Sequence, residues 1–111
     1  MESKEHKTKR WAADKAAGND GEDWAKLKHK VTHPFDEVGS HKKNDDPYDI
    51  YYKSSGKPKI RVEVKLNDTP LSEPQKEFQK KPNTDVMRVG RNNPVHIGRE
   101  IGRKFKENFI E

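Results

Sequence analysis

The sequence predicts an α/β fold in which a small mixed β-sheet is flanked by helices. Residues 48–52 and 60–66 predict two strands, because apolar side chains at every second position place one face of each strand against a core. The connection over 53–59 is short and turn-forming, so the two strands form an antiparallel hairpin. A third strand over 85–89 follows a helix, and a right-handed crossover would lay it parallel to the second strand.

A helix is predicted ahead of the hairpin, between Asp20 and His33. Asp20 can cap its first turn, and Pro34 ends it because a proline disfavours helical backbone in the residue before it. One short strand within 35–47 would follow this helix. The apolar residues of the helix recur at helical spacing, at Trp24, Leu27 and Val31.

Two more helices are predicted after the hairpin. The first covers about 73–81 and begins with a capping box at Ser72-Glu73-Pro74-Gln75. In a capping box the side chains of the serine and the glutamine each hydrogen-bond the backbone of the other residue. The second begins at Asn93-Pro94, since proline is favoured in the first helical turn. Its apolar face repeats every fourth residue, at Ile97, Ile101, Phe105 and Phe109.

The length of 111 residues leaves room for one domain. Residues 18–21 contain glycines that break the helical pattern. We therefore expect residues 1–18 to form a mobile basic N-terminal arm, followed by a single domain over 19–111.

The composition predicts a thin hydrophobic core. Hydrophobic residues make up 28% of the chain and charged residues 39%, so one small domain buries little apolar surface. We expect part of the chain to be disordered and a second subunit to complete the fold as a homodimer. Cysteine is absent, which excludes disulfides and thiolate metal sites. No apolar run approaches the length of a membrane span, so the expected location is cytoplasmic.

Three polar side chains of the hairpin carry the candidate chemistry. Glu63 and Lys65 point to the same face of their strand, roughly 6.6 Å apart along it. Asp49 alternates with the apolar residues of the preceding strand, so it joins Glu63 and Lys65 if those apolar residues share the core. The simpler interpretation is that all three belong to the solvent face of an amphipathic hairpin.

Two carboxylates beside a lysine suit the hydrolysis of a phosphodiester bond. Carboxylate oxygens bind Mg²⁺ or Mn²⁺, which polarises a phosphate and lowers the pKa of water. A lysine stabilises negative charge on the phosphate or positions that water. The hairpin therefore predicts a magnesium or manganese site at Asp49 and Glu63, with Lys65 beside it.

The arrangement resembles the PD-(D/E)xK nuclease superfamily. The superfamily pattern of an aspartate, a hairpin and then (Asp/Glu)-x-Lys is matched by Pro47-Tyr48-Asp49 and Glu63-Val64-Lys65. Roughly residues 18–90 fit the superfamily core. The resemblance implies a restriction-endonuclease-like fold for the domain, and a Mg²⁺-dependent endonuclease with DNA as its partner, either structure-selective or restriction-like.

The resemblance also implies supporting residues. Glu22 looks like the acidic residue that some members, archaeal Holliday-junction resolvases among them, carry on the first helix. Gln75 looks like the glutamine that several branches place on the helix after the motif. One departure is that the proline stands two residues before Asp49, which leaves Asp45 or Asp46 as the alternative ligand; the strand alternation favours Asp49.

Basic side chains flank the proposed site in sequence. The net charge is +5, from 24 Lys and Arg against 19 Asp and Glu, and a basic surface attracts phosphate backbones. A merely solvated surface is the alternative. The residues that we expect to contact DNA are Lys42, Lys43, Lys53, Lys57, Arg88 and Arg91.

Three histidines of the sequence have simpler interpretations than a metal-binding or catalytic role. His29 and His33 are four residues apart, as in paired helical zinc ligands, but no third ligand has supporting spacing and Pro34 should end the helix. We interpret both as surface residues. His41 could act as a general base near neutral pH, but a loop histidine without a role is the simpler interpretation.

Two other functions stay open on the sequence alone. One is a catalytically inactive nucleic-acid-binding module of the same fold. The other is a basic interaction protein whose carboxylates and lysine are only a charged strand face. Metal dependence separates a nuclease from both, and salt-sensitive DNA binding separates the two alternatives from each other.

Overall fold

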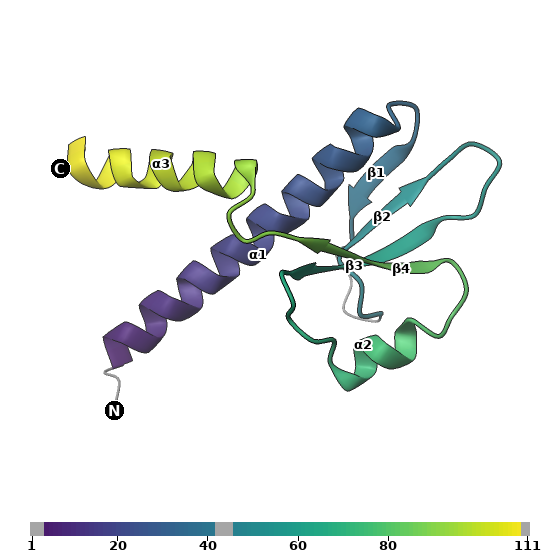
Figure 1. Cartoon of the computed structure of the whole chain (residues 1–111), viewed down its shortest axis with the longest axis horizontal. Coiled ribbons are helices and arrows are strands. Elements are labelled where there is room, and N and C mark those ends of the chain that lie inside the picture. Colours follow the sequence, from purple (N-terminus) through teal and green to yellow (C-terminus); the bar gives the residue numbers. More distant parts are fainter. Residues whose placement is uncertain (1–3, 42–45, 110–111) are drawn as a thin grey trace.

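The computed structural model describes residues 4–41 and 46–109 (Figure 1). It is a small α/β domain with one mixed four-stranded sheet flanked by helices, as the sequence predicts. In chain order its elements are helix α1 (Lys4–Thr32), strands β1 (Glu37–Ser40), β2 (Ile50–Lys53) and β3 (Ile60–Leu66), helix α2 (Glu73–Phe78), strand β4 (Thr84–Val89) and helix α3 (Pro94–Phe109).

The strands follow their sequence order across the sheet, β1-β2-β3-β4. The first two pairs are antiparallel, with Ile50 opposite Val62 in the hairpin. β3 and β4 are parallel, and α2 lies in the connection between them. The hairpin, the short strand after the first helix and the parallel crossover strand are therefore confirmed. β2 begins later than predicted, at Ile50, and α2 ends earlier, at Phe78.

The core lies between α1 and one face of the sheet. α1 comes close to the sheet at Gly21, where a Cβ would lie 2.9 Å from Leu66 Cδ2 and 3.1 Å from Val89 Cγ2. Glycine at this position therefore permits close packing of the helix on the sheet. The buried apolar cluster consists of Ala25, Ile50, Val62 and Val89.

α2 lies on the other side of the sheet from the core and contacts β3 there. Alternation along β3 points Val62 into the core beneath α1, and Arg61 and Glu63 to the opposite side. Two side chains of α2 contact Arg61 and Glu63. The Arg61 guanidinium lies 4.8 Å from the Phe78 ring centroid, and Gln75 hydrogen-bonds Glu63. α1 thus packs on the apolar face of the sheet, and α2 contacts its polar face.

α1 continues through residues 18–21, so the predicted break there, with a helix starting at Asp20, is wrong. Asp20 caps no helix: it lies in the interior of α1, is 1% exposed, and contacts α3. Gly21 allows α1 to pack closely on the sheet and does not form a turn. The backbone of residues 4–17 accordingly belongs to the same helix as the residues that pack on the sheet.

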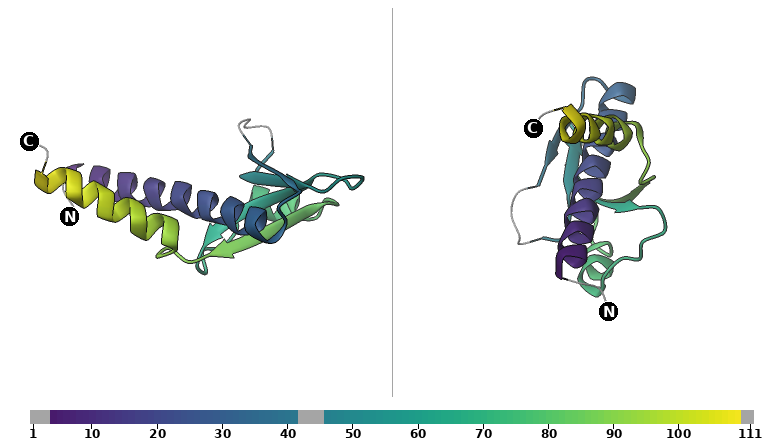
Figure 2. Two further views of the ribbon diagram at one scale, coloured as in Figure 1. Left: turned by 90° about the horizontal axis from the view of Figure 1, so that it is seen from above. Right: turned by 90° about the vertical axis from the view of Figure 1, so that its left-hand side faces the viewer.

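α3 is held at the end of β4 by polar contacts with α1. Asn93 caps α3, because its Oδ1 accepts from the His96 amide at 3.0 Å. Asp20 accepts from Arg99 at 2.7 Å and from Arg103 at 3.3 Å, and its carboxylate lies 2.8 Å from His96 Nδ1. Figure 2 shows both helices projecting from the same end of the sheet. No helix in the described ranges is both long and apolar enough to cross a membrane.

We predict that α3 pairs two copies of the chain as a homodimer. Ile97 and Ile101 are 48% and 65% exposed on this helix, and neighbouring exposed apolar side chains mark association surfaces. The side chain of Phe109, the last member of the predicted apolar face, lies outside the described part of the chain. Sedimentation at tens of micromolar should show a dimer, and Ile101→Glu should return it to monomer because a charge would be buried at the interface. An unmodified chain that sediments only as monomer would contradict the prediction.

Candidate active site

Asp49 lies where β2 leaves its regular pairing with β3. Its amide donates to the Val62 carbonyl at 2.9 Å, and its carboxylate Oδ2 accepts from the Val64 amide at 2.8 Å. The side chain thus takes the place of a strand carbonyl for an amide of β3. On its other side, the Asp49 carbonyl accepts from the His41 amide at 2.8 Å. Hydrogen bonds on both sides therefore hold the Asp49 backbone, and the Val64 amide holds its carboxylate.

Glu63 stands on the polar face of β3 and is only 3% exposed. Gln75 Nε2 donates to Glu63 Oε1 at 2.8 Å. The capping box of α2 sets the orientation of the Gln75 amide: its Oε1 accepts from the Ser72 amide at 2.8 Å, so its NH₂ group must face Glu63. A local motif that is visible in the sequence therefore positions a residue of the site.

Lys65 follows Glu63 on the same face of β3. Its Nζ lies 4.0 Å from Glu63 Oε1, and its side chain is 18% exposed. The ammonium is thus close to a buried carboxylate while one side of it still reaches solvent. A charged ligand that approached from solvent could contact it there.

Glu22 brings a third carboxyl group to this place, from α1. It hydrogen-bonds the Asp49 carboxylate. Burial, and then the neighbouring Asp49 carboxylate, raise the pKa of Glu22 to about 7, and the same two causes raise the pKa of Glu63 to about 8. When no cation is bound, both carboxyl groups therefore favour the protonated form far more than an exposed glutamate does.

The structure brings Asp49, Glu63, Lys65, Glu22 and Gln75, five residues singled out in the sequence, close together. Contacts connect them in a series: Gln75 bonds Glu63, Glu63 bonds Asp49, and Asp49 bonds Glu22. Their elements, α1, the hairpin and α2, are far apart in the chain. Tertiary packing from both faces of the sheet therefore assembles the cluster, which we call the carboxylate cluster.

The carboxylate cluster fits a divalent cation that prefers oxygen ligands. Three carboxyl groups meet the ammonium of Lys65, and protons on Glu22 and Glu63 relieve their mutual repulsion. Positive charge from Mg²⁺ or Mn²⁺ could replace those protons, because both ions favour carboxylate oxygen. The carboxyl groups that such an ion would contact here are those of Asp49, Glu63 and Glu22.

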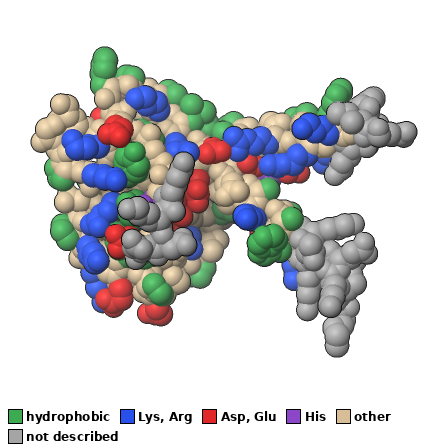
Figure 3. All heavy atoms as spheres, turned by 180° about the vertical axis from the view of Figure 1, so that it is seen from behind, with side chains coloured by type: hydrophobic (Ala, Val, Ile, Leu, Met, Phe, Trp, Pro, Cys, Tyr) green, Lys and Arg blue, Asp and Glu red, His purple; other side chains and the backbone are tan. Residues whose placement is uncertain are grey.

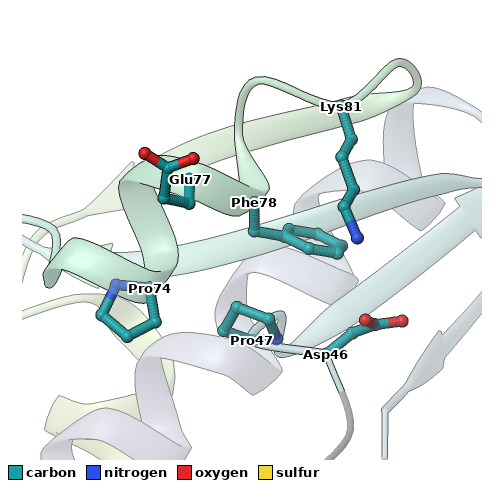
Figure 4. A pocket seen from close by; sticks show the side chains of 6 residues that line it. All are labelled: Asp46, Pro47, Pro74, Glu77, Phe78 and Lys81. Atoms are coloured by element: carbon teal, nitrogen blue, oxygen red, sulfur yellow. The ribbon is translucent and has the colours of Figure 1, made fainter.

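Asp46, an alternative ligand on sequence grounds, lies elsewhere. It lines a pocket of about 350 Å³ between α2 and the segment that leads into β2 (Figure 4). That pocket includes none of the residues of the carboxylate cluster. Asp45, the other alternative, lies outside the described residues. The remaining lining residues are Pro47, Pro74, Glu77, Phe78 and Lys81.

Tyr48 does not share the core with Ile50 and Tyr52, although the alternation predicts that it does. Its ring stacks on Phe78 of α2, with 5.7 Å between centroids, and on His41, with 3.8 Å. The reason is that β2 begins only at Ile50, so strand alternation does not extend to Tyr48. The stacking also encloses His41, whose Nε2 is buried without a hydrogen-bond partner in the part of the chain that the structure describes.

The basic residues expected to contact DNA fall into different environments. Lys53 and Lys57 are exposed at the turn between β2 and β3. Arg88 instead donates to two backbone carbonyls of the connection after β3, at 3.0 and 2.8 Å, and Arg91 pairs with Asp14 of α1 at 3.0 Å. Figure 3 shows Lys and Arg side chains along the side of the body opposite the projecting helices. Lys42 and Lys43 lie outside the described residues.

Comparison with protein-family models, with curated proteins and with solved structures gave no match to this chain. Its function is therefore inferred from the chemistry and geometry of the residues themselves.

Proposed function

We propose that this chain is a metal-dependent endonuclease of the PD-(D/E)xK type, which hydrolyses phosphodiester bonds in DNA on a restriction-endonuclease-like fold. The observation that carries the proposal is the convergence of Asp49, Glu63 and Glu22 beside Lys65. On a solvated strand face these carboxyl groups would titrate in their ordinary range. Instead Glu63 is 3% exposed and its pKa is about 8, and strongly shifted pKa values in a cluster are typical of functional sites.

Asp49 and Glu63 would hold Mg²⁺ or Mn²⁺, and Glu22 is close enough to contribute. When bound, the cation supplies polarisation of the scissile phosphate and a lower pKa for the attacking water. Glu22 and Glu63 release their protons when the cation binds, so the affinity of the site for metal should rise with pH.

Lys65 and Gln75 have separate tasks in this proposal. Lys65 lies 4.0 Å from Glu63, so its ammonium can stabilise negative charge on a phosphate that binds at the cluster. Gln75 is a positioning residue, because it touches Glu63 and is itself held by the cap of α2. Its amide keeps one Glu63 oxygen directed toward α2 and leaves the other for Asp49 or a cation.

A cleavage assay tests the proposal directly. Linear duplex, single-stranded and four-way-junction DNA are incubated with the full chain, with and without Mg²⁺ or Mn²⁺. We expect cleavage of at least one substrate, only when the cation is present, because the carboxylate cluster needs it to bind and polarise the phosphate. If none of the three substrates is cut with either ion, the proposal fails, and a binding function becomes the better account.

The salt dependence of DNA binding separates a DNA-binding module from a basic interaction protein. Each phosphate neutralised by Lys or Arg contributes a slope of about −0.9 in log K against log salt on duplex DNA. Combining Lys53→Gln with Lys57→Gln should therefore reduce the magnitude of the slope by about 2, measured by fluorescence titration. Lys80→Gln is the matched control and should leave the slope unchanged, because Lys80 pairs with Glu77 at 2.9 Å and is not among the residues expected to contact DNA. A slope near zero for the unmodified chain would favour the interaction protein.

A further inference from the structure

We propose that His29, His33 and Asp36 form a second metal site, for Zn²⁺ or a similar transition-metal ion, where α1 ends and the chain turns into β1. One ligand atom from each of the three residues lies within 4.8 Å of the other two. The site uses none of the residues of the carboxylate cluster, so it does not depend on the proposed nuclease function.

The end of α1 places the three side chains together. His29 and His33 are one helical turn apart, and the His33 amide still bonds the His29 carbonyl at 2.8 Å, so both rings lie on one side of the helix with centroids 4.5 Å apart. Pro34 then stops the helix, and a turn closed by the Asp36 amide on the His33 carbonyl at 3.1 Å brings Asp36 back. Asp36 Oδ2 lies 2.7 Å from His29 Nε2. The turn supplies the third ligand that a helical pattern alone cannot supply.

The hydrogen bonds of Thr32 indicate which nitrogen of His33 is available to a metal. The Thr32 hydroxyl has one hydrogen, and its bonds to the carbonyls of Lys28 and His29, at 3.0 and 3.2 Å, use it. When the hydroxyl donates to one of these carbonyls, the same oxygen accepts from His33 Nδ1, 2.9 Å away. Nδ1 then carries the proton, and the lone pair stands on Nε2, the form in which a histidine binds a metal through Nε2.

The other two ligands are held from behind. Ser54 donates to Asp36 Oδ1 at 2.7 Å and leaves Oδ2 facing His29, while the ring of Tyr52 stacks on His29 with 3.9 Å between centroids. Hydrogen bonds and packing that orient ligands in this way are usual around metal sites in proteins. His29 and Asp36 are buried and His33 is exposed, so an ion could enter from the side of His33.

The ligand set selects a different ion from that of the carboxylate cluster. Two imidazoles and one carboxylate suit Zn²⁺, and three protein ligands leave a fourth tetrahedral position for water. Mg²⁺ takes oxygen ligands and favours the carboxylate cluster instead. The two sites should therefore be distinguishable by metal and by mutation.

A zinc titration of the untagged full chain against a chromophoric competing chelator tests this site. We expect one tightly bound Zn²⁺ per chain. His33→Ala should weaken that binding by at least about 10-fold, because it removes one of three ligands. Glu63→Gln is the control for the carboxylate cluster and should retain the tight site. The exposed position of His33 makes its replacement tolerable for the fold, which far-UV circular dichroism would check.

A second readout does not depend on any variant. Zn²⁺ should shift the ring resonances of His29 and His33 in the NMR spectrum of the unmodified chain, while Mg²⁺ should leave them in place. The proposal is overturned if no tight Zn²⁺ binds, if folded His33→Ala binds it as tightly as the unmodified chain, or if neither ring resonance moves.

Discussion

Asp49→Asn should reduce Mg²⁺-dependent DNA cleavage by at least about 100-fold, because it removes charge from an oxygen ligand of the proposed cation. The change is nearly isosteric. The asparagine carbonyl oxygen can still accept from the Val64 amide, which the Asp49 carboxylate now does at 2.8 Å, so the hairpin should keep its geometry. DNA binding without metal should hold or improve, since one carboxylate that repels phosphate has been neutralised. Single-turnover cleavage and a binding titration on the same variant would measure both effects.

Asp46→Asn is the matched control for this substitution. Asp46 is equally acidic and close in sequence, but it lines the pocket beside α2 and is not part of the carboxylate cluster. Cleavage by Asp46→Asn should match that of the unmodified chain. The assignment of Asp49 is wrong if Asp49→Asn cuts normally while Asp46→Asn is inactive, and the whole site is wrong if both variants cut normally.

The metal-free protein should lose stability as the pH rises from about 5 to about 9. Glu22 and Glu63 have pKa values of about 7 and about 8 in the folded chain, above the ordinary 4.5, so the folded state binds more protons than the unfolded state between these values. Their contribution is fully present below pH 4.5 and is lost as the pH rises through 7 and 8. At about 1.4 kcal/mol per pKa unit the two shifts would add to about 8 kcal/mol if they were independent. They share Asp49 as a cause, and Glu22 is only partly buried, so we expect a smaller loss, on the order of 3 kcal/mol.

Urea denaturation at several pH values, with and without Mg²⁺, measures this effect. Glu63→Gln should flatten the pH dependence, because the amide cannot ionise and can donate to Asp49 as the protonated carboxyl does. Mg²⁺ should restore stability mainly at high pH, where the carboxylates are ionised. If the stability of the unmodified and Glu63→Gln chains changes with pH in the same way, Glu63 does not carry the raised pKa.

Local sequence patterns determined most of the sheet. Alternation of apolar and polar residues over 60–66 specifies a strand with one buried face, and the short connection before it permits only an antiparallel partner. The capping box at Ser72 specifies the start of α2, and the helix between β3 and β4 then makes that pair parallel. The same alternation places Glu63 and Lys65 on one face of β3. Asp49 precedes β2, and its carboxylate is positioned by the Val64 amide. Glu22 and Gln75 came from the superfamily resemblance, because nothing in a single helix indicates which of its polar residues will face a distant strand.

Tertiary structure alone decided the remaining features. The two glycines within residues 18–21 predict a break in the helix, yet α1 continues through them. Gly21 lies where the helix packs against Leu66 and Val89, so a glycine is needed there for close contact with the sheet. The shift of the Glu63 pKa depends on burial beneath α2 and on the arrival of Asp49 and Glu22 from other elements, so no property of β3 by itself predicts it.

The histidines at the end of α1 show the same limit. Their spacing is visible in the sequence, but the third ligand, Asp36, becomes apparent only when the turn after Pro34 folds back on the helix. The sequence by itself determined which residues alternate, cap and turn, because those preferences act between near neighbours along the chain. The tertiary structure decided which polar side chains lie together. The contacts that bury these side chains and shift their pKa values join segments that are far apart in the sequence.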